Sequence, residues 1–547
     1  MKTKHDKNLV VAAIACGMLL VLPGCLPALR SPFPAQPLQQ DYSLPPGFIG
    51  ANGAENSAQV PAREFFTDPN LTSLIDQALV GNLQLKILFE DIAIANNEVM
   101  RRRGAYFPFF TLGGLAGFRK VSIYTLEGSD TYSNALPGLP PVGTGVPTTT
   151  FPNPLGEFFL PAVDFTWQVD IWRQLRNARD AQIRRWMSTV DGRNYFVTRV
   201  VAEIAENYYA LMALDARMQN LDSVIAIQEQ SLKIAEARMA GVRSTALGVQ
   251  RFLAEVRKNQ SEKRIISQQI IETENRINFL CGRYPQRVER NPAGFINLPL
   301  PRLSVGVPPQ LLQNRPDIRE AERKLQAAGL DVDVARKNFY PRLDITGGVG
   351  YEAYNAKYLY LTPQSLVYGV AGGLVGPLIN RTAIRADYQN ANAKQLQALY
   401  DYQRILLNAF IEVVNQVNGV QNYTDSITLK SQQVRALERS VDIANLLFQN
   451  ARIEYIDVLF AQRDMWQGRR DLIDTKLQQM TSMVDTYQAL GGGWQNRPSV
   501  PSVPLVVAPP GEGEPAAVAV PPPPRVEEEL PVPPKEDGPG PLVRPQD

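Results

Sequence analysis

The sequence predicts a mainly helical protein with some membrane β structure, built from two tandem repeats. One sequence motif occurs twice: "AYFPFFTLGGLAGF" (105–118) resembles "NFYPRLDITGGVGY" (338–351), 233 positions later. The chain has 43 prolines, yet residues 162–284 and 378–497 contain none. Because proline interrupts long helices, both proline-free blocks are expected to be helical. Apolar residues recur at every seventh position through these blocks, which supports the same conclusion.

The heptad pattern predicts long helices packed side by side as coiled coils. It runs through Ile183, Val190, Val197, Ile204, Leu211, Met218, Ile225, Leu232 and Met239, and through Leu399, Leu406, Val413, Val420, Ile427, Val434, Val441 and Phe448. A helix over residues 176–239 would be about 95 Å long at ~1.5 Å per residue. Each long helix then breaks and returns, and a shift of 209 relates the two breaks. Gly241 and Asn450 are residue types that tolerate positive φ at such a helix end.

Each half therefore has the order short helix, strand, strand, long helix, turn and returning helix. The strands are expected at about residues 107–122, 158–171, 341–353 and 365–377. In "AVDFTWQVD" (162–170) apolar side chains alternate with polar ones, and the second half repeats this pattern. A soluble sheet with one wet face is the commoner source of alternation. However, about 9–11 residues suffice to cross a bilayer, and the glycine-rich polar faces suit a lumen.

Four strands are too few to close a membrane barrel, which needs about eight. An open sheet edge is not viable in lipid, so the barrel has to be shared between copies of the chain. Three copies would supply twelve strands. The sequence thus predicts a trimeric twelve-stranded β-barrel that is continued by a barrel of long helices.

The N-terminus has the pattern of a bacterial lipoprotein signal. Three lysines precede an apolar run over residues 9–22, which is too short to span a bilayer and leads into "LPGC". Cleavage after residue 24 would leave Cys25 as the lipid-bearing first residue. An ordinary signal with a chance cysteine is the alternative. Leu26 follows rather than Asp, so the inner-membrane retention signal of some bacteria is absent.

Composition excludes several function classes. Without residues 1–24 the chain holds 53 basic and 53 acidic residues, which argues against a nucleic-acid surface. The single histidine, His5, leaves with the signal, and Cys281 is then the one cysteine besides Cys25. We therefore expect no soft-metal site, no cofactor and no nucleophile–imidazole pair, and so no enzyme.

Six stretches carry a resemblance to a known family. They are "LTSLIDQALVGNLQL" (71–85), "NRPDIREAERKLQAA" (314–328), "NFYPRLDITGG" (338–348), "GPLINRTAIRADY" (376–388), "NARIEYIDVLFAQRD" (450–464) and "YQALGGGW" (487–494). With these stretches and its lipoprotein start, the chain resembles the outer-membrane factor family over about residues 20–495. These are the TolC-like channels of Gram-negative bacteria, and the resemblance is to the NodT-type efflux lipoprotein branch.

The resemblance implies a homotrimer in the outer membrane, lipid-anchored through Cys25, with a helical barrel that crosses the periplasm. The implied domains are 1–24, signal peptide; 25–68, lipid-anchored extended segment; 69–283, first repeat; 284–313, linker in an equatorial belt; 314–495, second repeat; and 496–547, a Pro-rich tail without a core. The implied function is an exit duct for small molecules delivered by an inner-membrane pump, of the RND type, through a periplasmic adaptor. A duct for type I protein secretion and a trimeric coiled-coil stalk or adhesin are the alternatives.

The resemblance also implies where the functional residues lie. The adaptor would dock at the helix-turn tips, formed by Gly241, Val242, Arg243, Ser244, Asn450, Ala451, Arg452 and Tyr455, with Leu247 alongside. Asp457 and Glu454 would form an acidic gate, although Gly248 stands where some relatives have an acid. For Asp457 a solvated helix-start position is the simpler alternative, and for Arg243 and Arg452 a helix-terminal cation is.

Four further residues receive structural interpretations. Trp167 and Trp172 are expected at a membrane interface, and Cys281 is expected to fill buried space. Pro316 and Asp317 are expected to begin a helix, since Pro suits the first turn and Asp complements the dipole.

Overall fold

The structure is a computed structural model, which describes residues 27–33, 56–120, 122, 125, 154–240, 246–291, 294–301, 303–306, 308–377, 381–450 and 452–494. Contacts divide the chain into one unit over Met1–Ser499 and another over Val500–Asp547. The second unit lies outside the described residues, as do the signal segment, Cys25 and the Pro-rich tail. Everything that follows therefore concerns the first unit.

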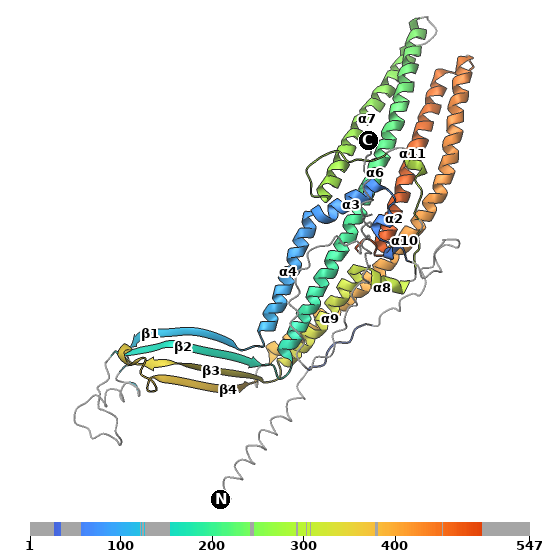
Figure 1. Cartoon of the computed structure of the whole chain (residues 1–547). Coiled ribbons are helices and arrows are strands. Elements are labelled where there is room, and N and C mark those ends of the chain that lie inside the picture. The colour runs from blue at the N-terminus through green and yellow to red at the C-terminus, as the bar shows by residue number, and fades with distance from the viewer. Residues whose placement is uncertain are drawn as a thin grey trace, which may run out of the picture. The chain divides into compact units, whose positions relative to one another are not determined.

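The elements occur in the predicted order within each half (Figure 1). The first half contains α3 (Pro69–Gly81), α4 (Leu83–Gly104), β1 (Phe109–Arg119), β2 (Leu155–Val169), α6 (Gln174–Ala240) and α7 (Ala246–Leu280). The second contains α8 (Leu311–Asn314), α9 (Pro316–Lys337), β3 (Arg342–Ala353), β4 (Leu366–Val375), α10 (Thr382–Gln449) and α11 (Tyr455–Ala489). Short helices η2 (Ser57–Gln59) and α2 (Ala62–Phe65) precede the first half, η3 (Phe295–Asn297) and η4 (Pro308–Gln310) lie between the halves, and η5 (Ala356–Tyr358) joins β3 to β4.

The duplication is confirmed at the level of helix bounds. Adding 233 to the residue numbers of α4 gives both bounds of α9, and adding 209 to those of α7 gives both bounds of α11. The returning helices also end alike, because Gly282 and Gly491 both have positive φ, 68° and 91°. A Cβ at Gly282 would lie 2.2 Å from the carbonyl oxygen of Gly81, and one at Gly491 would lie 2.6 Å from that of Asn314. Each glycine thus lets a returning helix end close against a short helix of its own half.

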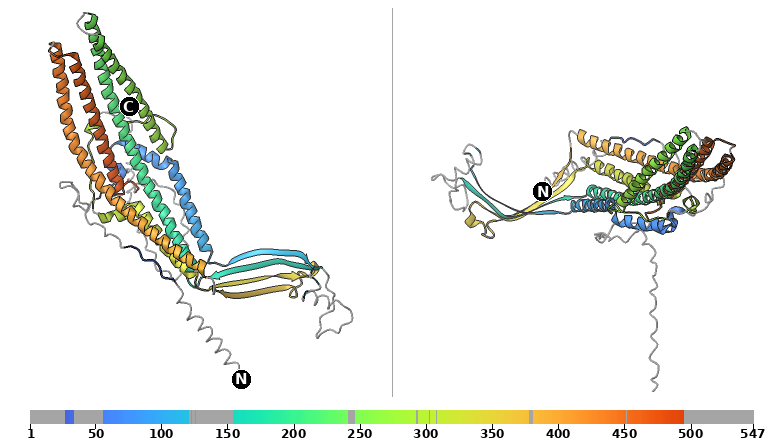
Figure 2. Two further views of the ribbon diagram at one scale, coloured as in Figure 1. Left: turned by 180° about the vertical axis from the view of Figure 1, so that it is seen from behind. Right: turned by 90° about the horizontal axis from the view of Figure 1, so that it is seen from above.

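The four strands form one antiparallel sheet in the order β1-β2-β3-β4. The views of Figures 1 and 2 agree that this sheet lies at one end of the long helices and that both helix-turn tips lie at the other. β2 pairs with β3, so the central pairing joins the two halves of the chain. Within the described residues β1 and β4 each have one neighbouring strand, which leaves both outer edges open.

The hydrophobic core lies among the helices rather than at the sheet. It forms where α6, α11, α3 and the segment before α3 meet. Tyr208 and Tyr487 are among its largest fully buried side chains. Phe65 stacks on Tyr487 with ring centroids 4.2 Å apart, and the Tyr487 hydroxyl donates to the carbonyl oxygen of Val60 at 2.8 Å. These contacts attach the N-terminal segment to the returning helix of the second half.

The heptad positions face inward along both long helices. Val197, Ile204 and Leu211 are buried in α6, and Val413, Val420 and Val434 are buried in α10. The other members are partly buried, apart from Met239 near the tip, which is 40% exposed. None of the helices that the structure describes is both long and apolar enough to cross a membrane.

Candidate functional site

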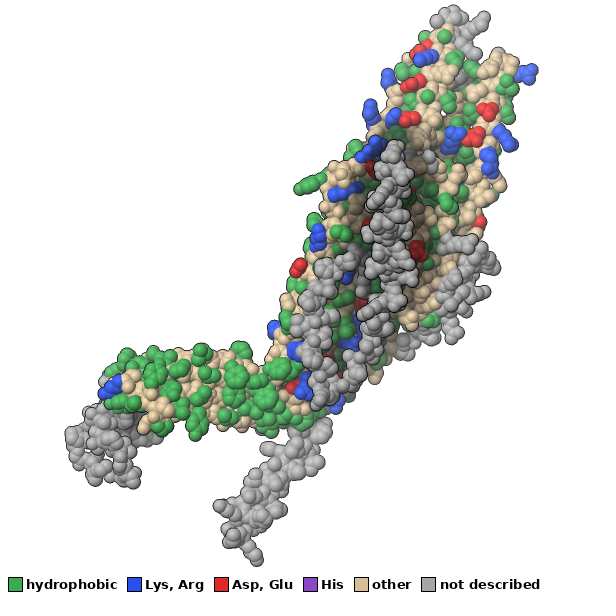
Figure 3. All heavy atoms as spheres, viewed as in Figure 1, with side chains coloured by type: hydrophobic (Ala, Val, Ile, Leu, Met, Phe, Trp, Pro, Cys, Tyr) green, Lys and Arg blue, Asp and Glu red, His purple; other side chains and the backbone are tan. Residues whose placement is uncertain are grey.

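One face of the sheet is apolar. The register sets Val163 opposite Val349 and Phe165 opposite Gly347, and it continues from Val349 to Tyr368 on β4. Residues of this face, from β1 to β4, include Phe110, Leu112, Val163, Phe165, Trp167, Val169, Leu343, Ile345, Val349, Tyr351, Tyr368, Val370 and Leu374. Leu112, Tyr368 and Val370 are 77%, 81% and 75% exposed. Hydrophobic side chains cover much of the sheet in Figure 3, whereas charged ones gather over the helices.

The opposite face carries mainly polar and small residues. Thr111 lies opposite Asp164, Thr166 opposite Thr346, and Gln168 opposite Asp344. On β4 the same face continues through Gly369, Ala371 and Gly373. The alternation predicted from "AVDFTWQVD" is therefore confirmed in β2 from Ala162 to Val169 and in β3, whereas β1 and β4 also place Phe109, Val367 and Val375 on the polar face. A sheet with an exposed apolar face and a glycine-rich polar face has the surface pattern of a barrel wall between lipid and water.

The repeated glycine-containing motif makes room for large side chains of β2. A Cβ at Gly347 would lie 2.5 Å from Cε1 of Phe165, and one at Gly350 would lie 2.8 Å from Cε2 of Phe159. In the first half, a Cβ at Gly114 would lie 1.9 Å from Cδ2 of Leu160. The two copies of the glycine-containing motif therefore lie on either side of β2, in β1 and β3. Each copy provides space for bulky side chains of β2.

Trp167 and Trp172 lie where the sheet meets the helices. The indole nitrogen of Trp167 donates to the carbonyl oxygen of Tyr106 at 3.0 Å, and that of Trp172 donates to the carbonyl oxygen of Pro341 at 2.7 Å. Trp172 also stacks on Tyr340, with ring centroids 5.1 Å apart. Both rings thus have an apolar body and a satisfied polar atom at the end of the apolar face. Their place at a membrane interface remains a prediction.

The helix-turn tips are described for the second half only. Gly241, Val242, Arg243, Ser244 and Ala451 lie outside the described residues. Leu247 is 63% exposed. Val249 and Val458, which the 209 shift relates, are both buried, and Val249 belongs to a cluster with Phe252 that packs against Leu459. The two tips are therefore in contact just inside the turns.

The turn at Asn450 differs from the expectation of positive φ. Asn450 has φ −86°, and its side-chain amide donates to the carbonyl oxygen of Leu446 at 2.8 Å. The backbone N–H of Arg452 donates to the carbonyl oxygen of Leu447 at 2.9 Å. The Asn side chain and this wider backbone bond satisfy the helix-end carbonyls, so no left-handed residue is needed at position 450.

The proposed gate residues lie at the start of α11. Glu454 is the N-cap residue, and the N–H of Asp457 donates to its carbonyl oxygen at 3.2 Å. The side chains of Glu454, Asp457 and Arg452 are exposed, while Tyr455 begins the helix. Asp457 in the first turn complements the helix dipole, whatever else it does. Among the described residues, no group of three or more Asp, Glu, His or Cys is arranged to hold a metal ion.

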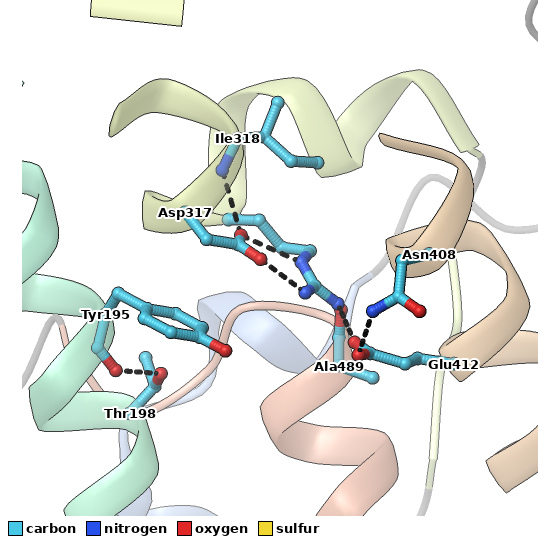
Figure 4. Close-up of polar contacts among 8 residues, drawn as sticks. Tyr195, Thr198, Asp317, Ile318, Asn408, Glu412 and Ala489 are labelled. Carbon is cyan, nitrogen blue, oxygen red and sulfur yellow. Dashed lines mark hydrogen bonds and ion pairs between the residues drawn. The ribbon is translucent and has the colours of Figure 1, made fainter. Parts of the chain in front are cut away.

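A buried arginine organises the contact between the two ends of the second half. The Arg315 side chain is 4% exposed, and it donates to both carboxylate oxygens of Asp317, at 3.0 and 2.6 Å. It also donates to Glu412 at 2.8 Å and to the carbonyl oxygen of Ala489 at 2.9 Å. Asp317 in turn accepts from the backbone N–H of Ile318 at 2.9 Å (Figure 4). The interpretation of "RPDI" as a helix start holds, since α9 begins at Pro316, but Asp317 also partners this arginine.

The first half uses a neutral residue at the same place. Asn82 corresponds to Arg315 at the shift of 233, and its side-chain amide donates to the carbonyl oxygen of Leu280 at 2.9 Å. Leu280 and Ala489 are equivalent last residues of the returning helices. The sequence alone did not predict the ion pairs of Arg315. The difference between Asn82 and Arg315, which occupy equivalent positions in the two repeats, is nevertheless visible in the sequence. In the first half, Cys281 follows Leu280 and is buried, as expected, with its thiol 3.6 Å from the carbonyl oxygen of Leu74.

A short N-terminal segment lies along α10. The N–H of Arg30 donates to the side-chain oxygen of Asn392 at 3.0 Å, and the N–H of Phe33 donates to the hydroxyl of Tyr400 at 3.1 Å. The segment thus follows α10 away from its sheet-proximal start as the residue number increases.

Comparisons with known proteins agree with this geometry. The "Outer membrane efflux protein" family profile matches residues 307–492. The chain is 25% identical to the cation efflux system protein CusC of Escherichia coli O6:H1, over 87% of this chain and 97% of that protein. It is 29% identical to the pyoverdine export outer membrane protein OpmQ of Pseudomonas putida, over 60% and 70% of the two chains. Its fold is similar to the open-state outer membrane channel MtrE of Neisseria gonorrhoeae, with a TM-score of 0.69, 20% identity and coverage of 85% and 99%. Residues 307–492 therefore match the outer membrane efflux protein family, and the proteins that align with most of this chain are outer-membrane efflux proteins.

Proposed function

We propose that this protein is the outer-membrane exit duct of a tripartite efflux system in a Gram-negative bacterium. It would conduct small molecules passively, without catalysis. The observation that carries this proposal is the two-faced sheet, whose apolar face is exposed while its polar face carries Thr, Asp, Gln and Gly. Such a sheet suits lipid on one side and water on the other. The relatives' names, which describe cation efflux and pyoverdine export, support efflux as the process.

The open edges of the sheet support a homotrimer. β1 and β4 would each leave a row of unpaired backbone groups in lipid, which has no water to satisfy them. Pairing β1 of one copy with β4 of the next closes the ring, and three copies give the twelve strands that the sequence predicts. The hairpins α6–α7 and α10–α11 would then form a helical barrel on the periplasmic side.

Lipid attachment at Cys25 fits the placement of the N-terminal segment. Arg30 bonds to Asn392 and Phe33 to Tyr400, so Arg30 lies nearer than Phe33 to the sheet-proximal start of α10. An anchor at Cys25, which precedes Arg30 in the sequence, would then attach the sheet end of the protein to the outer membrane. Replacement of Cys25 by Ser is expected to abolish incorporation of labelled palmitate, and retained labelling would contradict this assignment.

The tips are the proposed docking surface for a periplasmic adaptor, and Asp457 with Glu454 the proposed gate. Both lie at the end of the helices opposite to the sheet, and the exposed acids of α11 would meet those of the other copies near the axis. A ring of carboxylates would favour cations in the entrance. The adaptor would deliver substrate from an inner-membrane pump, of the RND type.

The docking proposal is tested by photocrosslinking in cells, with a photoreactive amino acid at position 452 or 243. Capture of a periplasmic adaptor supports the tips as the docking surface, and the adaptor's identity names the pump. A matched probe at Leu429 on α10, which is 67% exposed and distant in sequence from the tip, serves as the control. If the tip probes capture no adaptor while the protein is present in the outer membrane, the docking assignment fails.

The same experiment separates the alternatives. A type I secretion duct would yield the adaptor of a protein exporter, and a stalk or adhesin would yield only further copies of this chain. The returning helices α7 and α11 disfavour a stalk, since a stalk needs no hairpins.

A further inference from the structure

The short helix α4 exposes a face that is covered in its counterpart α9. In the views of Figures 1 and 2, α4 lies on one side of α6, whereas α9 and α10 lie on the other. Leu83, Ile87 and Ile94 are exposed on α4, and spacings of four and seven residues place them on one side of the helix. Ile94 is 64% exposed, whereas Ala327, its equivalent at the shift of 233, is 2% exposed. α4 therefore keeps an apolar stripe on the side that α9 buries.

The long helix α10 has an exposed face of the same kind. Leu407 is 60% exposed, whereas Thr198, its equivalent on α6 at the shift of 209, is 2% exposed. The second half of the chain covers α6 close to this position, because a Cβ at Gly493 would lie 3.4 Å from Cγ1 of Val201. Tyr284 is the first-half equivalent of Gly493, and it is 92% exposed. Both sides of this covered contact therefore have exposed counterparts, one on each half of the chain.

Contacts inside the two halves show that the shifts relate structure as well as sequence. Arg179 of α6 lies over the Tyr106 ring, with its Cζ 5.8 Å from the ring centroid. At the equivalent positions, Tyr388 of α10 contacts Phe339, with the ring centroids 5.8 Å apart. Each short helix thus approaches the long helix of its own half in the same way. The shifts therefore also predict how the second half of one copy would contact the first half of another.

One ion pair between the halves has a charged counterpart on the exposed faces. Arg185 of α6 pairs with Asp331 of α9. The shifts turn these residues into Lys394 on α10 and Glu98 on α4, with the same signs of charge. Lys394 is exposed. Glu98 pairs with Arg101 on its own helix and remains partly exposed, so its carboxylate can accept a second cation.

A second ion pair has its counterpart one residue further along α10. Asp191 of α6 pairs with Arg319 of α9 at 3.3 Å. Lys86 of α4 is the equivalent of Arg319, and Asp401 of α10 lies one residue beyond the equivalent of Asp191. Lys86 and Asp401 are both exposed, although Asp401 also pairs with Arg404 on its own helix. The exposed faces of α4 and α10 therefore match in apolar side chains and in the placement of opposite charges.

We propose that α4 of one copy docks on the exposed face of α10 of a neighbouring copy, in the way that α9 docks on α6 within the chain. This docking rests on the homotrimer proposed above, and it specifies the helical surface through which the copies join. The two faces differ, so the contact is head-to-tail, and a head-to-tail contact can close into a ring. The larger apolar residues of α4 and α10 suit this role, because separate copies are held by buried apolar area and not by chain connectivity.

The test is cysteine crosslinking of the full-length protein in outer-membrane preparations. A Cβ at Gly192 would lie 3.0 Å from Oε2 of Glu320, so the equivalent positions, Asp401 and Ile87, should be adjacent across copies. The variant that combines Ile87→Cys with Asp401→Cys is treated with a short bismaleimide and run on a denaturing gel. Because α4 and α10 lie on opposite sides of α6, a link between them joins two chains. We expect species of two and of three linked chains.

The controls are each single-cysteine variant and the combination of Met100→Cys with Asp401→Cys. Met100 is exposed on α4 but lies near the other end of that helix, so this combination should crosslink much less.

Charge reversal gives a second readout of the same surface. Lys394→Glu places an acid opposite Glu98, so it should lower the fraction of trimer in mild detergent. Glu98→Lys alone should also lower it, whereas the two changes together should restore the trimer. Failure of the double reversal to restore the trimer would refute the pairing of Lys394 with Glu98.

The outcomes separate the docking surface from the homotrimer. The docking proposal is overturned if the double-cysteine variant crosslinks no more than its controls while native mass spectrometry of the unchanged protein shows three copies. The ring then exists, but its helices join elsewhere. Linkage of α4 to a different protein, such as a periplasmic adaptor, also overturns the docking of a second copy. A single copy in the native spectrum contradicts the homotrimer itself.

Discussion

Replacing Arg315 by Ala should open the contact between the start of α9 and the end of α11. The arginine side chain is 4% exposed, and its removal leaves Asp317, whose side chain is 14% exposed, without its cation. The carbonyl oxygen of Ala489 loses a donor at 2.9 Å. Glu412, at 41% exposure, can regain water, so it adds little. Removing one partner of a buried ion pair costs about 3–5 kcal/mol, which corresponds to roughly two to three and a half powers of ten in local opening.

The assay is hydrogen exchange of the first turn of α9 and the last turn of α11. The matched control is Asn82→Ala, which removes the equivalent donor from the first half but leaves no buried charge. It should cost about 1–3 kcal/mol, because the carbonyl oxygen of Leu280 loses its donor and the N–H of Leu85 loses its N-cap acceptor. The effect should appear at the start of α4 and the end of α7. The reasoning is refuted if Arg315→Ala increases local opening no more than Asn82→Ala does. In that case the buried charge is not the reason that the Arg315 contact is costly to break.

Three further predictions concern the sheet and the gate. Val349→Arg on the apolar face should lower the amount of assembled protein in the outer membrane, because burying an arginine near the bilayer centre costs about 2–4 kcal/mol per copy. Thr346→Arg on the polar face should not lower it. Equal yields of the two variants in membrane fractions would contradict the assignment of faces. Gly347→Ala should reduce assembly, because its Cβ would lie 2.5 Å from the Phe165 ring, and Phe165→Ala should restore it; failure of the rescue would place the clash elsewhere. Asp457→Asn should lower the cation selectivity of single channels in planar bilayers, and unchanged selectivity would leave Asp457 as a helix-start residue only.

Local sequence signals predicted most of the fold. Proline-free blocks and heptads indicated α6 and α10, and alternation indicated β2 and β3, because helix and strand periods act over a few neighbouring residues. The turn at Asn450 was missed in detail. Its residue type tolerates positive φ, but the side chain capped the helix in an ordinary conformation instead. Asn can end a helix either with positive φ or with a side-chain hydrogen bond to a helix carbonyl. The residue type alone does not decide between these two conformations.

The charged contacts escaped sequence reasoning for a different reason. Arg315, Glu412 and the last carbonyl of α11 are separated by up to 174 residues in the chain. The sequence contains these residues among more than one hundred other charged ones, and only their spatial arrangement selects the partners.

The sequence by itself determined the duplication, the long helices, the two-faced strands and the absence of histidine from the chain beyond residue 5. These follow from periodicity and composition, which are local or additive properties. Only the tertiary structure decided which glycine accommodates which ring, and which half of the chain carries the buried arginine. Those outcomes depend on side chains that meet across the fold, where burial turns a single substitution between repeats, such as Asn82 against Arg315, into a different kind of bond.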